Sequence, residues 1–389
     1  MDGTPEKETR KVIDGQLEDS GWSVLKRGET IPNKGAFASE EYPTSSGPAD
    51  YVLVVDGNII GIVEAKKSGE PVYGVLTQAQ RYARDIEIEG TNYNFTDFNF
   101  KVPFIYSTNG QDVYFQDLRY EDSRSRKVLT FHTPEALLEF LDSDYTESKL
   151  WLVNNPNEDK YLRYYQREAI QAIEVNLQRN KRKMLLAMAT GTGKTVTIIS
   201  LLYRMLKSGM FKRILFLVDR IELANQALGT LASFEPEPGQ KFDRIYEVFC
   251  RRVPEGREWK SLNINTRLMP ESKISYPQPN DAHVFVATIQ SMYRLLTGEE
   301  EPEKETEADE WGKDVDKINY NSKIPIHAFD LIISDECHRS IYNKWKVVLD
   351  YFDAVQIGLT ATPAAHTYAY FDSNLAYAYP LKRQFRMVI

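Results

Sequence analysis

A short glycine-rich loop near the middle of the chain carries the clearest chemical signal. Gly191 and Gly193 let backbone N–H groups approach phosphate oxygens, because glycine has no Cβ to stand in the way. Lys194 has the reach to contact the β- and γ-phosphates of a nucleotide, and Thr195 offers a hydroxyl to Mg²⁺. We therefore predict that this loop binds ATP. The predicted cradle consists of Thr190, Gly191, Thr192, Gly193, Lys194 and Thr195.

The residues on either side of the loop agree with this prediction. An apolar run at 184–189 precedes it and apolar residues at helical spacing follow it, so the loop joins a strand to the start of a helix. The N-terminal end of a helix stabilises a phosphate through its dipole. Met188 stands where the strict loop pattern has glycine. A plain glycine-rich turn is the alternative, but the strand, loop and helix together favour a phosphate site.

A pair of acids follows a later apolar run, in the segment DLIISDECHRS at 330–340. Carboxylates at the carboxyl end of a parallel strand lie over the ligand crevice of an α/β sheet. We expect Asp335 to hold Mg²⁺ and Glu336 to orient and polarise the water that attacks the γ-phosphate. Cys337 and His338 are types that bind metals, but we expect them to pack at the domain face.

Four further segments follow the order found in superfamily 2 helicases and translocases. They are Tyr165-Gln166, LVDRIEL (217–223), VATIQSM (286–292) and LTATP (359–363). With the loop and the acid pair, they make residues 161–365 resemble the motor of that superfamily, in which Met188 occupies an often relaxed position. The resemblance implies that Gln166 reads adenine, and that the two middle segments contact the DNA backbone. It also implies that Thr360, Ala361 and Thr362 couple the state of ATP to movement on DNA.

Two acids and a lysine near the N-terminus form a second candidate site. Asp50 precedes an apolar run at 51–55, and Glu64 and Lys66 lie at the end of a second run at 59–65. An Asp-Gly pair between the runs predicts a hairpin, whose open end would bring Asp50 and Glu64 together. Two carboxylates there suit Mg²⁺. Because Lys66 shares a strand face with Glu64, it can orient a water and offset phosphate charge during phosphodiester hydrolysis.

This arrangement resembles the PD-(D/E)xK nucleases. Gln78 and Tyr82 fit the Q-x-x-x-Y element that accompanies such sites in type I restriction R subunits and some recombination nucleases, and their spacing puts both on one helix face. The resemblance also implies a metal-site acid on the first helix, with Glu8 as candidate and Glu18 as rival. In the alternative interpretation the acids and lysine are only exposed residues at a strand end. An acid in an apolar run is costly to bury without a purpose, which favours a site.

The elements around the two sites predict two α/β units. The first covers residues 1–145, residues 146–160 are polar and predict a linker, and the second covers residues 161–389. In the first unit we expect a helix at 8–22, strands at 51–55 and 59–65, a helix at 71–86, and strands at 102–110 and 113–118. In the second we expect strands at 184–189, 213–218, 283–288, 330–336 and 355–362. Helical patterns between several of these strands predict a doubly wound parallel sheet, RecA-like in the superfamily 2 resemblance.

Composition bounds the class of protein. The chain has 389 residues, 42% of them hydrophobic, and a net charge of −8, so charge gives no support for nucleic-acid binding. Because no apolar run is long enough to span a membrane and no secretory signal is visible, we expect a cytoplasmic bacterial or archaeal protein. The two cysteines disfavour a disulfide framework. The acidic segment at 299–317 is expected to be a solvated insertion.

A nuclease of this type in front of a superfamily 2 motor resembles the R subunit of a type I restriction–modification enzyme, over residues 5–380. Type III restriction subunits have a similar motor but carry the nuclease C-terminally. The resemblance implies ATP and Mg²⁺ as cofactors, ATP-driven translocation on double-stranded DNA, and cleavage far from the recognition site. It also implies a complex with methylation (M) and specificity (S) subunits, and no membrane.

A superfamily 2 motor needs a second RecA-like domain, which supplies an arginine finger. We expect that domain to be absent from this chain, which would then be a truncated form. Two other interpretations stay open. One is a DNA or RNA helicase whose front domain binds without catalysis, and the other is an assembly or anchoring protein with an inactive motor.

Overall fold

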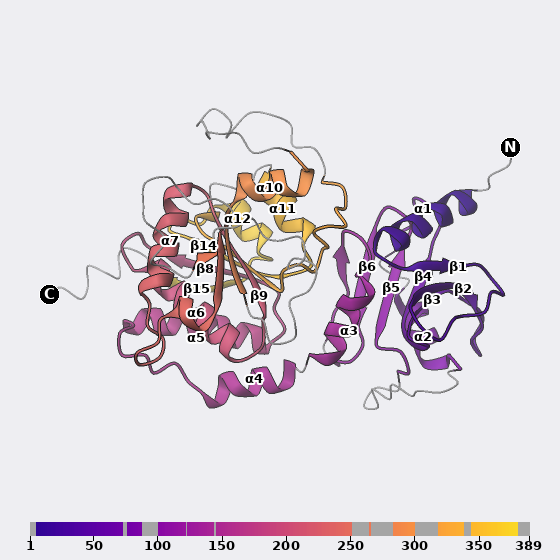
Figure 1. The fold of residues 1–389 in the computed structure, drawn as a ribbon, viewed down its shortest axis with the longest axis horizontal. Coiled ribbons are helices and arrows are strands. Elements are labelled where there is room, and N and C mark those ends of the chain that lie inside the picture. Colours follow the sequence, from indigo (N-terminus) through magenta and orange to yellow (C-terminus); the bar gives the residue numbers. More distant parts are fainter. Residues whose placement is uncertain are drawn as a thin grey trace. The chain divides into compact units, whose positions relative to one another are not determined.

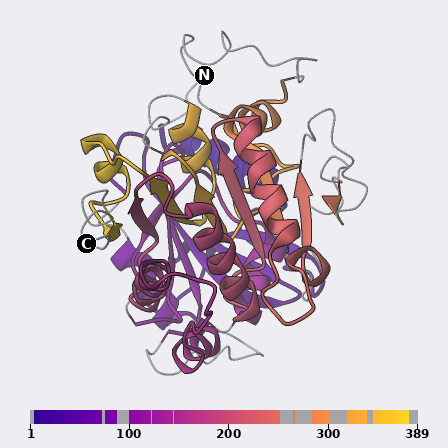
Figure 2. The same cartoon turned by 90° about the vertical axis from the view of Figure 1, so that its left-hand side faces the viewer.

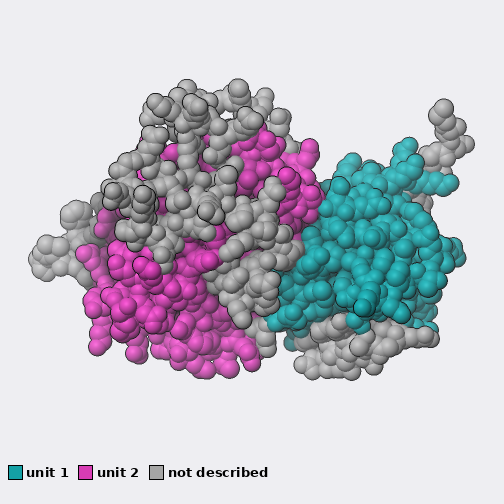
Figure 3. Space-filling view, in the orientation of Figure 1, with its two compact units in different colours: residues 1–143 teal, residues 144–389 magenta. Residues whose placement is uncertain are grey.

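The chain forms two compact units in the computed structural model, unit 1 at residues 1–143 and unit 2 at residues 144–389 (Figure 3). Each unit has a sheet of its own, flanked by its own helices (Figure 1). The structure describes residues 5–72, 76–87, 100–121, 123–143, 145–250, 264–265, 283–299, 318–337 and 344–379.

The described part of unit 1 contains a seven-stranded mixed sheet whose strands follow one another in chain order. The strands are β1 (Ser23–Leu25), β2 (Ala36–Tyr42), β3 (Ala49–Val55), β4 (Asn58–Ala65), β5 (Phe104–Thr108), β6 (Val113–Asp117) and β7 (Arg126–Val128). β3 and β4 form the predicted hairpin, and β4 pairs in parallel with β5. β1, β2 and β7 fall outside the prediction, because β1 and β7 are three residues long and β2, AFASEEY, contains no β-branched residue.

The β3–β4 hairpin positions the first candidate site. Its two-residue turn at 56–57 has positive φ at both positions, 48° and 79°, as a type I′ turn requires. Tyr51 pairs with Val63, which places Asp50 beside Glu64 one step nearer the open end. Cross-strand neighbours share one face of a sheet, so the two acids lie on the same face.

The helices of unit 1 cover both faces of this sheet (Figure 1). They are α1 (Pro5–Asp19), α2 (Leu76–Asp85) and α3 (Pro134–Asp142). Asp14 of α1 accepts a hydrogen bond from Tyr51 Oη at 2.8 Å, whereas Ala79 and Tyr82 of α2 pack in a core with Val52. Because successive residues of a strand face opposite sides, α1 and α2 lie on opposite faces. The helices predicted at 8–22 and 71–86 are thus present, with shifted ends.

Unit 2 contains an eight-stranded sheet among its described residues, in the order β11-β10-β12-β9-β13-β14-β8-β15. Every pair is parallel, which confirms the predicted parallel α/β class. The strands are β8 (Lys183–Met188), β9 (Arg213–Val218), β10 (Glu247–Cys250), β11 (Ile264–Asn265), β12 (His283–Thr288), β13 (Leu331–Ser334), β14 (Val355–Thr360) and β15 (Leu375–Tyr379). β10, β11 and β15 fall outside the prediction, since β10 and β11 are very short and β15 reads LAYAY, without β-branched residues.

Helices flank both faces of the unit 2 sheet. Phe216 of β9 packs in a core with α5, α6 and α7, which Figure 2 shows from their own side, while Leu215 and Leu217 are buried on the opposite face. α10 and α11 lie on that second face (Figure 1). The helices are α4 (Tyr145–Asn154), α5 (Tyr164–Gln178), α6 (Lys194–Lys207), α7 (Ile221–Ser233), α8 (Phe242–Ile245), α10 (Ile289–Thr297), α11 (Lys344–Tyr351) and α12 (Ala365–Tyr370). No helix in the described ranges has the length and apolar character to cross a membrane.

The segment predicted as a linker, residues 146–160, is largely helical. It contains most of α4, whose Leu152 is buried in the core of unit 2. The polar stretches at its two ends dominate the composition, but the central LWLV provides apolar contacts that anchor the helix. These residues therefore belong to unit 2 and do not form a free linker. The predicted insertion at 299–317 lies outside the described residues except for Glu299.

Candidate active sites

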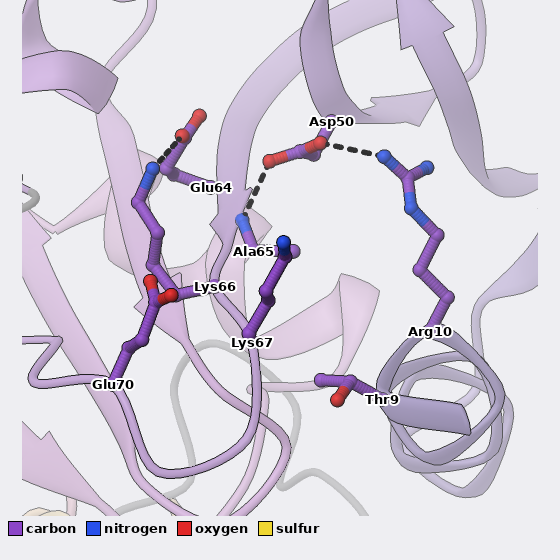
Figure 4. A pocket seen from close by; sticks show the side chains of 8 residues that line it. All are labelled: Thr9, Arg10, Asp50, Glu64, Ala65, Lys66, Lys67 and Glu70. Atoms are coloured by element: carbon purple, nitrogen blue, oxygen red, sulfur yellow. Dashed lines mark hydrogen bonds and ion pairs between the residues drawn. The ribbon is translucent and has the colours of Figure 1, made fainter. Parts of the chain in front are cut away.

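Asp50, Glu64 and Lys66 come together at one pocket of unit 1. The pocket has a volume of about 280 Å³, and Figure 4 shows the two acids and the lysine facing it. Its lining consists of Thr9, Arg10, Asp50, Glu64, Ala65, Lys66, Lys67 and Glu70. The structure thus brings together the three side chains that the sequence singles out.

Hydrogen bonds fix the orientation of these three side chains. Asp50 Oδ2 accepts the backbone N–H of Ala65 at 2.8 Å, across the hairpin. Lys66 Nζ donates to Glu64 Oε1 at 2.9 Å. Glu64, near the carboxyl end of β4, is only 3% exposed. It is therefore a buried acid, and the alternative that it is only an exposed residue at a strand end does not hold. The arrangement holds two carboxylates and one ammonium within a small polar pocket.

The Q-x-x-x-Y residues support the lysine. Lys66 Nζ donates a second hydrogen bond to Gln78 Oε1 at 3.3 Å, and Gln78 Nε2 donates to Tyr82 Oη at 3.0 Å. Gln78 and Tyr82 are one helical turn apart on α2, so they form a continuous chain of contacts to Lys66. Their predicted supporting role agrees with this geometry.

The electrostatics of the pocket are those of two acids held close together. Burial, followed by repulsion from Asp50, raises the pKa of Glu64 to about 7. Burial also raises the pKa of Asp50, against the hydrogen bond from Ala65 and the charge of Arg10. Burial opposes the charged form of Lys66, but its pairing with Glu64 raises its pKa. A divalent cation would relieve the repulsion between the two carboxylates, so the donor set fits Mg²⁺ completed by water.

The acid expected from the first helix does not reach the pocket. Glu8 and Glu18 are exposed and are not among the lining residues. The face of α1 that meets the sheet carries Thr9 and Arg10 instead, one and two residues further along. Helix phase, which the sequence pattern sets only approximately, decides which residue points inward. Across all described residues, no group of three or more His, Cys, Asp or Glu is placed to hold a metal ion together. The pocket therefore offers Mg²⁺ the pair Asp50 and Glu64 without a third acid.

Arg10 joins the pocket to an acid that the sequence analysis does not identify. Its Nη2 lies 2.8 Å from Asp50 Oδ1 and 2.6 Å from Glu41 Oε1, in β2. The ETRK sequence around Arg10 offers no signal beyond a charged helix, and Glu41 lies in a strand that the pattern does not predict. Only the pairing of β2 with β3 places Glu41 near Asp50.

The predicted phosphate loop of unit 2 joins β8 to α6. Gly191 and Gly193 adopt φ values of 79° and 77°, the left-handed region that favours glycine. Lys194 is the first residue of α6, and its Nζ pairs with Glu336 Oε1. The loop, the lysine and the acid pair therefore meet at the carboxyl edge of the sheet, where α/β folds bind ligands.

The acid pair follows β13 directly. The N–H of Asp335 donates to the carbonyl of Leu217 at 2.9 Å, and the N–H of Glu336 donates to Asp335 Oδ1 at 2.9 Å. Glu336 has a φ of 51°, uncommon for a residue with a Cβ, so the backbone here carries strain. Burial raises the pKa of Asp335, against the charge of Lys194. Their roles with Mg²⁺ and water stay predictions.

Gln166 contacts the loop itself. Its Nε2 donates to the carbonyls of Thr192 at 3.0 Å and Gly193 at 3.3 Å, and its Oε1 accepts the N–H of Arg163 at 2.8 Å. Both ends of the amide are thus bound to backbone, and the side chain ties the start of α5 to the loop. Its reading of adenine stays a prediction.

The last described strand also contacts the loop. Tyr379 of β15 accepts the N–H of Ala189 at its carbonyl, at 3.1 Å. Its ring stacks on Tyr165, with centroids 4.1 Å apart, and Tyr165 Oη donates to the carbonyl of Thr192 at 3.2 Å. The tyrosine pair therefore contacts the residue before the loop and the middle of the loop.

The coupling segment follows β14, the strand beside β8. Thr360 is buried, pairs in register with Ala187, and accepts the N–H of Thr362 at its Oγ1, at 3.1 Å. Ala361 lies between them. This places the segment next to the strand that leads into the phosphate loop, as coupling would require, and the coupling role stays a prediction.

Cys337 is buried beneath the same strand. A Cβ added at Gly358 of β14 would lie 2.9 Å from its Sγ, so the two residues are in close contact. Burial raises the pKa of the thiol, which disfavours a metal-binding thiolate. His338 lies outside the described residues.

Both units of the chain match known protein families. An all-parallel sheet with helices on both faces and a glycine-rich loop between β8 and α6 defines unit 2 as RecA-like. Residues 159–365 match the family described as "Type III restriction enzyme, res subunit", and the chain belongs to that family. Residues 25–141 match "Type I restriction enzyme EcoKI endonuclease subunit second domain".

Individual relatives agree with both matches. The chain is 32% identical to the type I restriction enzyme EcoKI endonuclease subunit of Escherichia coli K12, over 93% of this chain and 33% of the relative. It is 29% identical to the EcoAI endonuclease subunit of Escherichia coli, over 81% of this chain and 33% of the relative. The chain thus spans about one third of the length of these curated relatives and is a homologue of type I restriction endonuclease subunits.

A solved structure shows a weaker likeness. The nuclease-deletion mutant of the type ISP restriction–modification enzyme LlaGI, in complex with a DNA substrate mimic, is 25% identical over 52% of this chain and 18% of its own. Its TM-score of 0.35 is too low to support an argument. The match of unit 1 to a type I subunit favours a restriction subunit over a helicase with an unrelated front domain.

Proposed function

We propose that this chain is the DNA-cleaving and ATP-dependent DNA-translocating part of a type I restriction–modification enzyme. It acts on double-stranded DNA together with methylation and specificity subunits. The convergence of Asp50, Glu64 and Lys66 on one pocket is the observation that carries the proposal. The similarity to the EcoKI and EcoAI endonuclease subunits supports it, as does the agreement of both units with restriction-enzyme families.

In unit 1, Asp50 and Glu64 hold Mg²⁺, which supplies Lewis-acid chemistry at the scissile phosphate when bound. Lys66, tied to Gln78, places an ammonium beside the reacting phosphate and offsets the negative charge that grows in the transition state. Its paired state with Glu64 keeps it protonated at neutral pH. Tyr82 steadies Gln78 and so acts at a distance.

In unit 2, the backbone of the loop at 190–193 binds the phosphates of ATP, and Lys194 contacts the terminal ones. Thr195 and Asp335 hold Mg²⁺. Glu336, which pairs with Lys194 here, turns to the attacking water when Lys194 engages phosphate. The use of ATP follows from the motor family, and the use of Mg²⁺ is part of the proposal.

The test is conversion of supercoiled plasmid to nicked and linear forms by the chain, with Mg²⁺ or EDTA present. We expect cleavage only with Mg²⁺, and its loss in Asp50→Asn. The matched control is Asp56→Asn, in the turn of the same hairpin, where asparagine fits the left-handed backbone. Equal cleavage by the Asp50→Asn variant and the unaltered chain would show that the pocket is not the nuclease site.

A further inference from the structure

Arg10 is a charged residue of the pocket that the proposed chemistry leaves without a role. It reaches Asp50 from α1, on the side away from Glu64 and Lys66 (Figure 4). Its Nη2 bridges Asp50 Oδ1 and Glu41 Oε1. Each of the two candidate metal ligands therefore has a cation of its own, Arg10 for Asp50 and Lys66 for Glu64.

The contact with Arg10 completes the anchoring of Asp50. One oxygen of this carboxylate accepts the N–H of Ala65 and the other accepts the guanidinium, so the plane of the carboxylate is fixed. Each carboxylate oxygen can accept a second partner, and a cation can still bind between Asp50 and Glu64. Arg10 thus orients Asp50 without blocking it.

The charge of Arg10 must also act on any cation bound there. The side chains of Arg10, Asp50 and Glu41 are 24%, 19% and 25% exposed, so water screens them only in part. A unit charge about 5 Å from a divalent cation changes its affinity on the order of tenfold even at the dielectric constant of water. Glu41 is bound to Arg10 and carries the opposite charge, so it offsets part of this repulsion.

We infer that Arg10 and Glu41 form a charge pair that sets the divalent-cation affinity of the Asp50–Glu64 site. Arg10 is a positioning residue that orients Asp50 and weakens cation binding. Glu41 holds Arg10 and moderates the weakening. The inference rests on the proposed function, because it takes Asp50 and Glu64 as the ligands.

The test is Mn²⁺ binding to the full chain in the absence of DNA, measured by electron paramagnetic resonance or calorimetry. Arg10→Met removes the charge at similar length, and we expect Mn²⁺ to bind on the order of tenfold more tightly. Glu41→Gln leaves Arg10 uncompensated, and we expect binding several-fold weaker. Arg10→Lys keeps the charge and should bind Mn²⁺ like the unaltered chain. If Arg10→Met fails to fold, Arg10→Lys is the Arg10 variant that is measured beside Glu41→Gln.

Lys26, which directly follows β1, provides a control cation that also bridges two acids. Its Nζ bridges Asp14 of α1 at 2.6 Å and Glu40 of β2 at 2.8 Å, an arrangement like that of Arg10 but outside the pocket. Lys26→Met should leave Mn²⁺ affinity unchanged. Circular dichroism of each variant shows whether the fold is kept.

The outcomes separate the inference from the proposed function. Weaker or unchanged Mn²⁺ binding in folded Arg10→Met, with binding abolished in Asp50→Asn, would overturn the charge pair and leave the metal site standing. Absence of Mn²⁺ binding by the unaltered chain would overturn the metal site and the inference together. Opposite shifts in Arg10→Met and Glu41→Gln support the inference, since damage to the fold would weaken binding in both.

Discussion

The predicted phosphate loop of unit 2 and the acid pocket of unit 1 are two proposed sites of phosphate chemistry that are built by different means. The loop uses six consecutive residues, 190–195, and most of its groups are backbone N–H donors at a helix start. The pocket uses side chains from α1, β3, β4 and the segment after β4, which meet only when the sheet has formed. The loop site is therefore formed by a single stretch of chain, whereas the pocket of unit 1 is assembled by tertiary structure.

The difference has a consequence for how each site tolerates change. The loop depends on backbone conformation, so its sensitive positions are the two glycines with positive φ. The pocket depends on the balance of charge among the six ionisable residues that line it, so its sensitive positions are those where a charge is removed. The two sites should fail in different assays and for different reasons.

Removal of the pocket lysine should have the largest effect. In Lys66→Met, the charge that offsets the transition state is lost, and Mg²⁺-dependent cleavage should fall roughly 10²–10³-fold. ATP affinity should not change, since Lys66 belongs to unit 1. Plasmid nicking rates and nucleotide titrations of the same preparation measure both. A parallel fall in ATP affinity would contradict the independence of the two sites.

Removal of the loop lysine should give the converse result. In Lys194→Ala, the contact with the terminal phosphates is lost, and ATP affinity should fall on the order of tenfold to a hundredfold, at about 1.4 kcal/mol per factor of ten. Adenosine affinity should be unchanged, because the lysine touches only phosphates. Calorimetry with both ligands is the measurement. Equal losses for ATP and adenosine would show that Lys194 supports the fold of the loop and not the phosphates.

A smaller, pH-dependent effect should be confined to the pocket. Because the pKa of Glu64 is raised to about 7, protons and metal compete for its carboxylate, and Mn²⁺ affinity should rise about tenfold between pH 6 and pH 8.

In the metal-free chain, the free energy of unfolding should fall, not rise, over the pH range in which Glu64 loses its proton. The folded state binds this proton more tightly than the unfolded state, so stability falls as pH rises through about 4.5–7. Glu64→Gln should remove the stability step, which thermal unfolding at several pH values would detect.

The smallest effect should distinguish the two loop glycines. A Cβ at Gly193 would lie 2.6 Å from Gln166 Nε2, whereas one at Gly191 would have no neighbour within 4 Å. Both have positive φ, so each alanine variant costs about 1 kcal/mol of strain. Gly193→Ala should cost about 1 kcal/mol more, because Gln166 must leave the loop carbonyls. Calorimetric unfolding should show a Tm roughly 2–4 °C lower for Gly193→Ala than for Gly191→Ala. Equal Tm values would show that the contact of Gln166 with the loop does not contribute to stability.

The sequence predicts much of the molecule where the signal is local. The apolar strands of both units and the hairpin turn follow from runs of branched residues and from Asp56-Gly57. The meeting of Asp50 with Glu64 follows from that hairpin alone. The all-parallel sheet follows from the alternation of strands and helices.

The features that escape prediction depend on contacts distant in sequence or on weak patterns. Helix phase brings Arg10 inward in place of Glu8, and the pairing of β2 with β3 supplies Glu41. α4 is hidden by its polar flanks, although Leu152 anchors it in the core. Strand β15 has no β-branched residues, and its place beside β8 comes from tertiary packing.

The contact between β15 and the phosphate loop gives unit 2 a short mechanical linkage. Tyr379 is joined to Ala189 by a backbone hydrogen bond and, through the ring of Tyr165, to Thr192. Tyr379 therefore contacts the residue before the loop through its backbone, and the middle of the loop through the ring of Tyr165. Tyr165 is held in turn by Arg163, whose Nη1 donates to Tyr165 Oη at 3.0 Å. The position of the predicted phosphate loop is therefore coupled to the position of the end of β15.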